Sequence, residues 1–391
     1  MSRRILAAGD GAKRSTTVVT GAALAMLALA ACTSTAPPPP GQGGQGGPIQ
    51  VTASDTACEV SATEAPAGNI SFAVQNTGTK ITEFYVYGTG DRIVGEVENI
   101  GPGLSRQLIV EVPQGGQYTT ACKPGMVGDG IRAPFTVTGS TAGSTSQDAL
   151  LASAVAGYQR YTNSQIEAGI ARTQEFVDAI KAGDVDRAKA LFPVSRTYWE
   201  RVEPVAESFG DIDPRVDGRE DDERDPGVAW TGYHRLEKDL WVTGLQPDSA
   251  AMGDQLMADL RDLQTRAAAL QLTPVQLANG AKELLDEVAT GKITGEEDRY
   301  SHTDLWDFRA NVDGSQAAVA ALRPAIDQRD PALGPTLDQR FADVDALLEQ
   351  YRSGDGYVLY TQLTEQDKQR MTQAVDALGE PVSQVAGLVT T

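Results

Sequence analysis

Basic side chains are scarce in this sequence: 33 lysines and arginines accompany 53 aspartates and glutamates, giving a formal net charge of −20. A protein that binds nucleic acid needs a basic surface to neutralise phosphates, so the composition argues against a nucleic-acid partner. The negative charge favours cationic partners instead. The apolar run at residues 18–31 is too short for a comfortable membrane span, which takes about 20 residues.

Histidine and cysteine are scarcer still, with 2 histidines and 3 cysteines in 391 residues. Residues 48–139 contain no histidine, and a blue-copper site needs two histidines beside its cysteine, so that kind of copper site is excluded there. Residues 140–391 contain no cysteine, which argues against a copper(I) site. They also lack the His-Glu-x-x-His pattern that gives zinc peptidases two ligands and a general base.

The first 31 residues are typical of an export signal. Four basic residues precede the apolar run, which ends at residues 29–32 in Leu-Ala-Ala-Cys. This ending resembles the lipobox of bacterial lipoproteins, which implies cleavage before Cys32 and lipid attachment to its thiol. We therefore expect residues 1–31 to be a signal peptide and the mature protein to be anchored to the outer face of the cell membrane, in the periplasmic space. Ordinary secretion is the alternative, and the export route, Sec or twin-arginine, stays open.

Residues 32–48 have the composition of a linker. Four consecutive prolines favour an extended chain, and the glycine- and glutamine-rich tract after them favours a flexible one. The chain that remains is about 360 residues long, which is too long for a single core and predicts two domains.

Residues 49–139 predict an all-β domain. Short runs rich in β-branched and aromatic residues recur between glycine and proline turn signals, and such runs indicate strands. We expect strands at residues 49–53, 70–75, 81–87, 108–112, 117–121 and 135–138. About 90 residues of this kind are typical of a β-sandwich. The layout resembles a cupredoxin, because Cys-Lys-Pro-Gly-Met at residues 122–126 lies where cupredoxins carry ligands, in the loop before the last strand.

The two cysteines of this domain leave two possibilities open. A disulfide between Cys58 and Cys122 is chemically natural outside the cytoplasm. The alternative is a soft thiolate and carboxylate site that holds copper or iron. The remaining candidate ligands for such a site are Met126, Glu83, Glu96 and Glu98.

Residues 145–391 predict an all-helical domain. Helix start signals include Asp184, the Thr-Pro pair at residues 273–274 and the Thr-x-x-Asp pattern at residues 364–367. We expect helices at residues 147–182, 184–209, 229–241, 250–270, 274–289, 305–327, 336–350 and 365–378. Eight helices joined by short connections are typical of an all-α bundle.

One predicted helix carries a His-x-x-Glu pair, His234 and Glu237. Positions i and i+3 lie on the same face of a helix, with Cβ atoms about 5–6 Å apart, so the two side chains can reach one point. Inward-facing pairs of this kind, in the opposite order, build iron and manganese sites in helical bundles. The alternative is a histidine and a glutamate that satisfy each other in the core.

Carboxylate-rich stretches flank this pair in the sequence. Glu200 and Glu203 share a helix face, and residues 211–225 and 295–306 contain further acidic residues. Each stretch alone is typical of a solvated charged surface. However, the only other histidine, His302, also lies among them, and this coincidence favours a metal site. Carboxylate and imidazole together suit iron, manganese or zinc.

Two long motifs carry a resemblance to a known family. They are Thr-Gly-Tyr-His-Arg-Leu-Glu-Lys at residues 231–238 and Gly-Glu-Glu-Asp-Arg-Tyr-Ser-His-Thr-Asp-Leu-Trp-Asp-Phe at residues 295–308. Together with the cupredoxin-like segment they resemble the EfeO-type iron-uptake lipoproteins, whose helical part is imelysin-like. The resemblance implies a cupredoxin-like sandwich at residues 49–139 and an imelysin-like all-helical domain at residues 145–391.

The resemblance also implies function, ligands and partners. It implies an extracytoplasmic iron-binding component of an EfeUOB-type uptake system, which captures iron for an EfeU-type membrane permease alongside an EfeB-type haem peroxidase. The cargo would be iron, as Fe²⁺ or Fe³⁺, with copper or zinc as further possibilities. By position, the implied metal ligands are His234, Glu237, Glu200, Glu203, Asp217 and one of Glu296 and Glu297; those of a second site are Cys58, Glu83, Glu96 and Cys122.

Two other functions are possible on the sequence alone. Imelysin-like proteins were classed as metallopeptidases through their HxxE motif, so a zinc metallopeptidase is one alternative. His302 could be a ligand in that case, but no residue is then left as an obvious base, so we do not expect an enzyme. A polysaccharide-binding lipoprotein is the other alternative, and the negative charge disfavours it for acidic polymers.

Overall fold

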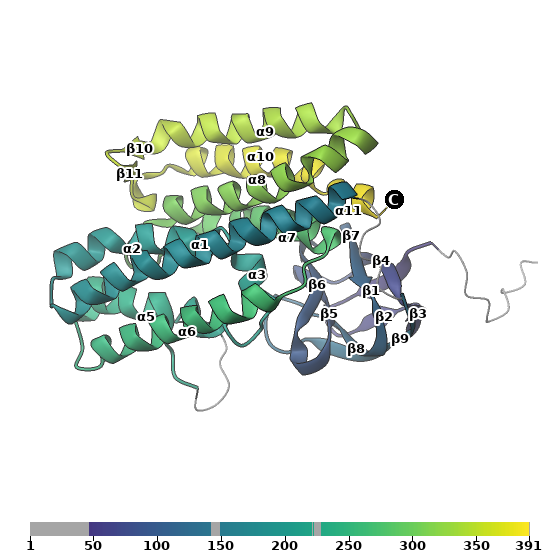
Figure 1. Ribbon diagram of the computed structural model, residues 1–391, viewed down its shortest axis with the longest axis horizontal. Helices are drawn as coiled ribbons and strands as arrows, with labels where there is room; N and C mark the ends of the chain where they lie inside the picture. Colours follow the sequence, from purple (N-terminus) through teal and green to yellow (C-terminus); the bar gives the residue numbers. More distant parts are fainter. Residues whose placement is uncertain (1–46, 142–148, 221, 223–227, 391) are drawn as a thin grey trace, which may run out of the picture. The chain divides into compact units, whose positions relative to one another are not determined.

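A computed structural model describes residues 47–141, 149–220, 222 and 228–390, all within one compact unit that spans Gln45–Thr391. A β region is followed along the chain by a helical region (Figure 1), as the sequence predicts. The predictions for the signal peptide, for Cys32 and for most of the linker fall on residues 1–46, outside the described residues. None of the described helices is long and apolar enough to cross a membrane.

The β region is a sandwich of two sheets with Phe72, Phe84 and Phe135 buried in its core. The ring centroid of Phe72 lies 5.2 Å from that of Phe84 and 5.6 Å from that of Phe135. One sheet has the order β2 (Cys58–Val60), β1 (Ile49–Ala53), β4 (Gly68–Asn76) and β7 (Ser105–Val112). The other has the order β3 (Glu64–Pro66), β9 (Ile131–Ser140), β8 (Gln114–Cys122), β5 (Thr82–Tyr87) and β6 (Ile93–Ile100), with the short 3₁₀ turn η1 (Thr89–Asp91) between β5 and β6.

All six predicted strands correspond to strands of the structure, but β2, β3 and β6 were not predicted. Strand β6 contains Gly95, although glycine in a strand usually weakens it. Here the glycine is required by packing: a Cβ atom at this position would lie 2.5 Å from Cγ1 of Val110. The close approach of β6 to β7 therefore explains the glycine.

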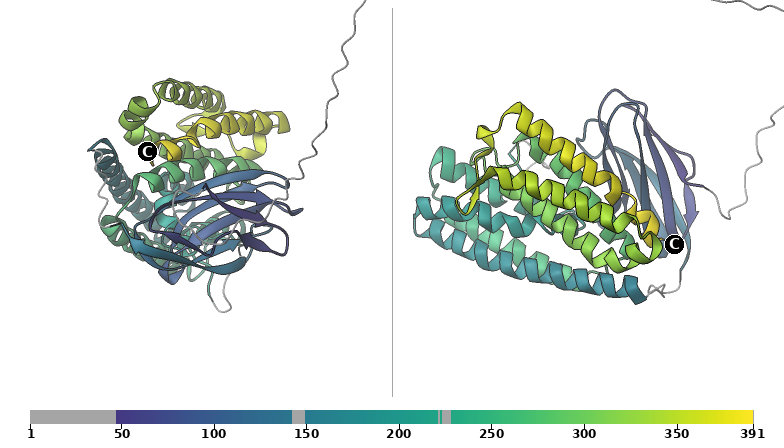
Figure 2. Two further views of the ribbon diagram at one scale, coloured as in Figure 1. Left: turned by 90° about the vertical axis from the view of Figure 1, so that its right-hand side faces the viewer. Right: turned by 90° about the horizontal axis from the view of Figure 1, so that it is seen from above.

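The helical region packs its helices around one apolar core. Helix α1 lies along α2 and α6, α7 packs on α8, and α9 packs on α10; Figure 2 shows α9 and α10 side by side. The longer helices are α1 (Ala149–Lys181), α2 (Val185–Glu200), α6 (Ser249–Ala269), α7 (Pro274–Thr290), α8 (Asp304–Arg329), α9 (Leu333–Leu348) and α10 (Glu365–Val382). The expected start signals operate in three of these helices, since Asp184, Thr273 and Thr364 each accept a hydrogen bond from a backbone N–H of the first turn.

Shorter elements complete the helical region and interrupt two of the predicted helices. The prediction of one helix over residues 184–209 was wrong, because α2 ends at Glu200 and α3 begins at Glu203. The predicted helix at residues 229–241 begins later, at Gly232, and continues into a π-helical turn. The short elements are α3 (Glu203–Glu207), α4 (Asp213–Val216), α5 (Gly232–Lys238), η2 (Asp239–Thr243), η3 (Lys292–Thr294), η4 (Glu349–Tyr351), β10 (Arg352–Ser353), β11 (Gly356–Tyr357), η5 (Tyr360–Gln362) and α11 (Val385–Val389).

Candidate metal centre

Charged side chains and one asparagine form a buried cluster inside the helical region. None of its members exposes more than 7 % of its surface, and charges at such depth require partners of opposite charge or a metal ion. The cluster is contributed by α2, α3, the residue after α4, α5, the segment from η3 to α8, and α8 itself. Its members are Arg196, Glu200, Glu203, Asp217, His234, Glu237, Lys292, Glu297, Asp298, Asp307 and Asn311.

The start of α5 is held against the end of α4, which brings His234 next to Asp217. Gly232 has a φ of +88°, and a Cβ atom there would lie 2.2 Å from the carbonyl oxygen of Val216. Only glycine fits both this conformation and this contact. Thr231 adds a hydrogen bond from its hydroxyl to the carbonyl of Arg215, at 2.8 Å.

Three predicted ligands, Asp217, His234 and Glu297, converge on one point. Nε2 of His234 lies 3.5 Å from Oδ1 of Asp217 and 3.4 Å from Oε1 of Glu297. One ligand atom from each of the three side chains lies within 4.8 Å of those of the other two, a spacing at which a single ion can contact all three. The nitrogen itself has no hydrogen-bond partner among the described residues.

Glu237 lies on the other side of the imidazole. Its Oε2 atom is 3.1 Å from Nδ1 of His234. Its Oε1 atom accepts hydrogen bonds from the backbone N–H groups of Tyr300, at 2.9 Å, and Ser301, at 2.7 Å. The predicted contact between His234 and Glu237 is therefore present, and Glu237 also ties α5 to the segment before α8.

Glu200 and Glu203 face a buried lysine rather than the histidine. The break between α2 and α3 turns both carboxylates toward Lys292, whose Nζ bonds Glu200 and lies 3.0 Å from Oε2 of Glu203. Asn311 donates to Oε2 of both glutamates, at 3.2 Å and 3.1 Å. Glu200, Glu203 and Asp217 also offer ligand atoms within 4.8 Å of one another, but two of these carboxylates already contact the lysine.

Arg196 is the second internal cation of the cluster. Its side chain is fully buried and bonds Asp217, while its Nη2 atom lies 2.5 Å from Oε1 of Glu200 and 2.8 Å from Oε1 of Glu297. The guanidinium carbon lies 5.6 Å from the ring centroid of Tyr233. Arg196 therefore neutralises part of the charge on three predicted ligands.

Two further carboxylates, Asp298 and Asp307, belong to the cluster and were not among the predicted ligands. Nε of Arg196 lies 3.4 Å from Oδ1 of Asp298 and 3.5 Å from Oδ2 of Asp307. Neither oxygen of Asp307 has a hydrogen-bond partner among the described residues. Both aspartates occur in the acidic motif at residues 295–308, so the motif located them but did not indicate which of its acids are buried.

The pKa values of His234 and Glu297 are shifted in opposite directions. Burial and the charge of Arg196 oppose protonation of His234, but the contacts of its ring with Glu237 and Glu297 and the charge of Asp217 raise its pKa to about 10. Burial acts to raise the pKa of Glu297, but Lys292, His234, Arg196 and Arg219 together hold that pKa well below its usual range. Without a metal, the imidazolium and the Glu297 carboxylate thus stabilise each other.

Three other buried carboxyl groups, those of Glu200, Asp298 and Asp307, have raised pKa values. Burial raises the pKa of Glu200 to about 7, against the opposing charges of Lys292 and Arg196. Burial also raises the pKa of Asp298 to about 6, against the charge of Arg196, and raises that of Asp307 well above its usual range. The cluster therefore contains more carboxylates than Arg196, Lys292 and the imidazolium of His234 can neutralise, and it favours an additional cation.

Two candidates of the acidic motif lie away from this point. Glu296 is exposed and lies 3.5 Å from Arg219, so Glu297 is the member of the pair that enters the cluster. His302, which could have been a zinc ligand, belongs to no group of three ligand atoms within 4.8 Å among the described residues. Its backbone lies in the left-handed region, with a φ of +60°, and connects to the 3₁₀ turn η5 through Tyr360 N–H at 2.8 Å.

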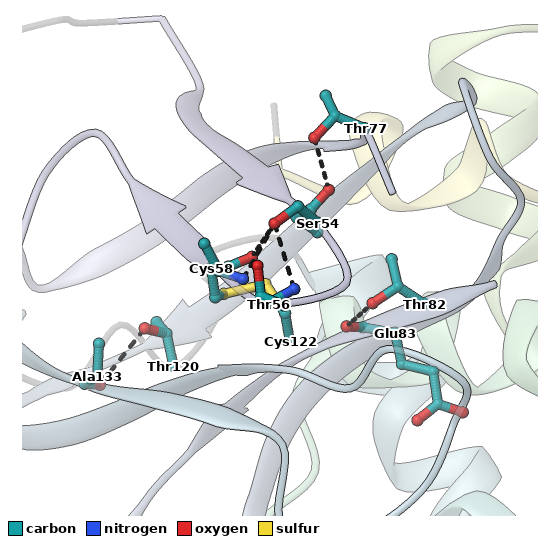
Figure 3. Close-up of a disulfide and its surroundings, with 11 residues drawn as sticks. Ser54, Thr56, Cys58, Thr77, Thr82, Glu83, Thr120, Cys122 and Ala133 are labelled. Atoms are coloured by element: carbon teal, nitrogen blue, oxygen red, sulfur yellow. Dashed lines mark hydrogen bonds between the residues drawn. A yellow bond between two sulfur atoms is a disulfide. The ribbon is translucent and has the colours of Figure 1, made fainter. Parts of the chain in front are cut away.

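The candidate ligands of the β region do not form one site. Cys58 and Cys122 are joined in a disulfide between the two sheets (Figure 3), so this pair offers no thiolate to a metal, and the disulfide alternative is the one that the structure contains. Figure 3 shows the side chain of Glu83 extending away from the disulfide. Burial raises the pKa of Glu96 to about 8, with a further contribution from the charge of Glu83.

The centre in the helical region has the chemistry of a site for a hard or borderline cation. One imidazole and several carboxylates suit Fe, Mn and Zn, whereas Cu(I) prefers sulfur ligands. Arg196 and Lys292 could not be recognised in advance, because they reach the cluster through contacts between distant parts of the chain: Arg196 and Glu297 are 101 residues apart. No local pattern distinguishes them from the other 31 basic residues, since lysines and arginines total 33.

Family models and known proteins match this sequence over most of its length. The imelysin family model matches residues 154–385, and a cupredoxin-like domain model matches residues 21–137. The iron uptake system component EfeO of Escherichia coli O157:H7 is 39 % identical over 346 residues, which cover 87 % of this chain and 91 % of that protein. The protein of the same name from Shigella flexneri gives the same identity and coverage.

A comparison with solved structures finds reduced auracyanin from Roseiflexus castenholzii. It is 20 % identical, covers 25 % of this chain and 100 % of that protein, and has a TM-score of 0.21, which is too low to support an inference. The sequence relatives and the family models are decisive by themselves: this chain belongs to the imelysin family and to the EfeO-type components of iron uptake systems.

Proposed function

We propose that the chain captures iron outside the cytoplasm and delivers it to an EfeU-type membrane permease. The observation that carries the proposal is the convergence of Asp217, His234 and Glu297 on one buried point inside an acidic cluster. The ion is cargo in this proposal, so the site has to bind it and also release it. Fe²⁺ and Fe³⁺ are the proposed cargo, because both accept carboxylate and imidazole ligands.

The internal cations support reversible binding. With Arg196 on Asp217 and Glu297, and Lys292 on Glu200 and Glu203, the carboxylates have partners when no ion is bound. A cluster of uncompensated buried carboxylates would pay a large desolvation penalty in that state. The incoming ion has to compete with Arg196 for Asp217 and Glu297, which moderates its affinity and favours release.

The cellular setting in this proposal follows from the sequence. Lipid attached to Cys32 anchors the protein to the outer face of the membrane, and residues 32–48 tether the folded part near the permease. An EfeB-type haem peroxidase acts in the same system. The formal charge of −20 favours the approach of cations to the protein surface.

A zinc metallopeptidase is the competing function, and the hydrogen bonds of Glu237 argue against it. A general base must be able to take a proton from the attacking water. Glu237, the acidic member of the His-x-x-Glu pair, is fully buried and already accepts three hydrogen bonds. We therefore infer that the chain is a binding protein and not an enzyme.

The proposal is tested by equilibrium binding to the mature protein carrying Cys32→Ser, which removes the lipid site. Fe(II) under anaerobic conditions, Fe(III) as a citrate complex, Cu(II) and Zn(II) are each titrated, and bound metal is measured by elemental analysis. We expect iron to bind at a defined stoichiometry and Asp217→Asn to weaken that binding. Absence of iron binding in the wild type, or equal binding by Asp217→Asn, would contradict the proposal.

A further inference from the structure

Both carboxylate oxygens of Glu237 accept hydrogen bonds, and direct ligation of a metal ion by Glu237 would have to compete with them. Both of its oxygens are engaged, Oε1 by the backbone N–H groups of Tyr300 and Ser301 and Oε2 by Nδ1 of His234. The side chain has no exposed surface. Two of the three donors belong to the backbone, so the orientation of the carboxylate is fixed by the fold.

This orientation determines the protonation of the imidazole. Oε1 receives two backbone N–H groups, as expected of a carboxylate, and a carboxylate can only accept hydrogen bonds. Nδ1 of His234 must then carry a hydrogen and donate it to Oε2. In a neutral imidazole, one nitrogen carries the hydrogen and the other has the free lone pair, so that lone pair is on Nε2.

Nε2 faces the convergent carboxylates. It has no hydrogen-bond partner among the described residues and lies 3.4 Å from Glu297 and 3.5 Å from Asp217. The two nitrogens thus have separate environments: Nδ1 faces a fixed acceptor, and Nε2 faces two side chains whose carboxylates could share an ion with it.

We propose that Glu237 is a positioning residue that fixes the hydrogen on Nδ1 of His234 and thereby directs Nε2 to a metal ion shared with Asp217 and Glu297. The inference rests on the proposed binding function and deepens it, because it divides the His-x-x-Glu pair into one ligand and one orienting group. Carboxylates that hold a metal-bound histidine in this way also increase the basicity of the ligand.

The alternative position for the ion uses Glu237 itself. His234, Glu237 and Asp298 also have ligand atoms within 4.8 Å of one another. An ion bound jointly by Nδ1 and Glu237 would require the hydrogen bond of 3.1 Å between them to be broken. Ligation through Nε2 leaves that hydrogen bond and both backbone hydrogen bonds in place, which is why we favour it.

The two positions are distinguished by ¹⁵N NMR of histidine-labelled protein loaded with Zn(II), a diamagnetic probe. The chain has only 2 histidines, and His302 provides the internal reference. We expect Nδ1 of His234 to retain its hydrogen and Nε2 to show the shift of a metal-bound nitrogen. Metal at Nδ1, or loss of the Nδ1 hydrogen, would overturn the inference while leaving the binding function intact. Failure of the wild type to bind any metal would instead count against the binding function.

Glu237→Gln provides a second, independent readout. Glutamine has one oxygen and one NH₂ group. If the oxygen stays on the two backbone N–H groups, the NH₂ group faces Nδ1 and moves the imidazole hydrogen to Nε2, which closes the ligand position. We expect Nδ1 to carry no hydrogen in the metal-free variant and Zn(II) affinity to fall by about 10–100-fold, the usual effect of losing such an orienting group.

The variant also has outcomes that count against the inference. Unchanged affinity together with the hydrogen still on Nδ1 would show that Glu237 does not control the tautomer. Circular dichroism establishes whether the variant is folded. Should it fail to fold, the spectrum of the Zn(II)-loaded wild type decides the question alone.

Discussion

Oε1 of Glu297 lies 2.8 Å from Nη2 of Arg196 and 3.4 Å from Nε2 of His234. One carboxylate oxygen therefore faces both an internal cation and the proposed metal-binding nitrogen. This contact links the energetics of the metal-free protein to those of binding, because any ion at Nε2 must share Glu297 with the guanidinium.

Replacing the internal cation should destabilise the metal-free protein more than the iron-bound one. Arg196→Met removes the positive charge from Glu200, Asp217 and Glu297, and breaking a buried ion pair in this way typically costs about 3–5 kcal/mol. A bound ion places positive charge beside Asp217 and Glu297, so the free energy of unfolding should fall less in the iron-bound protein. Urea unfolding with and without Fe(II) measures both values; equal losses would show that Arg196 and the ion act at separate places.

The stability of the metal-free protein should fall as pH rises from about 5 to 9. The pKa of Asp298 is raised to about 6, that of Glu200 to about 7 and that of His234 to about 10. Across this range the folded state therefore binds more protons than the unfolded state, and stability decreases with pH when that is so. Glu297, whose pKa is lowered, has the opposite effect, but only below about pH 4.5, near the usual glutamate value.

Iron should reverse this trend. Ligands must lose their protons to bind a metal, so affinity increases with pH, and an ion that binds only the folded state stabilises it in proportion to the logarithm of that affinity. Thermal unfolding with Fe(II) at several pH values between about 5.5 and 7.5 should show a stabilisation that grows with pH. If Fe(II) raised the unfolding temperature by the same amount at every pH in this range, the ligands would not lose protons on binding, and the prediction would be wrong.

The sequence located much of this centre because several contacts are local. His234 and Glu237 meet because three residues separate them on a helix, and Glu297 lies in a motif of recognisable composition. Glu200 and Glu203 were also expected to share a helix face, but the helix ends between them and both turn toward Lys292. This outcome depends on tertiary packing around α8, which no pattern in residues 184–209 records.

The internal cations were missed for the same reason. Arginine is mostly exposed in proteins, yet the side chain of Arg196 is fully buried among acids from distant segments. In the β region, Gly95 lies within a strand because a side chain at this position would collide with Val110. Long-range contacts of this kind become visible only in the folded chain.

The disulfide between Cys58 and Cys122 should stabilise the β region. It closes a long stretch of chain, since its cysteines are 64 residues apart. Replacing both cysteines by serine should lower the free energy of unfolding by about 2–5 kcal/mol, the usual range for small secreted domains. Thiol titration of the protein carrying Cys32→Ser should find no free thiol; two free thiols would show that the disulfide does not form in the purified protein.

Lipid attachment at Cys32 is a separate prediction that rests on the sequence alone. Cys32→Ser should move the protein from the membrane fraction to the soluble fraction, because the folded protein would then lack its lipid anchor. Fractionation and mass spectrometry of the mature N-terminus measure the change. Membrane association that persists in the variant, together with an N-terminus without lipid in the wild type, would contradict this prediction.

The central claim is that iron binds at the point where Asp217, His234 and Glu297 converge, and two adjacent glutamates test it most directly. Glu297 is buried in the cluster, whereas Glu296 is exposed, and each lies within 3.5 Å of Arg219. Glu297→Gln and Glu296→Gln remove the same charge one residue apart, but Glu297 also contacts Arg196 and Nε2 of His234. In anaerobic titrations with Fe(II), the account predicts a loss of affinity of at least about tenfold for Glu297→Gln and little change for Glu296→Gln. Equal affinities for the two variants would contradict it.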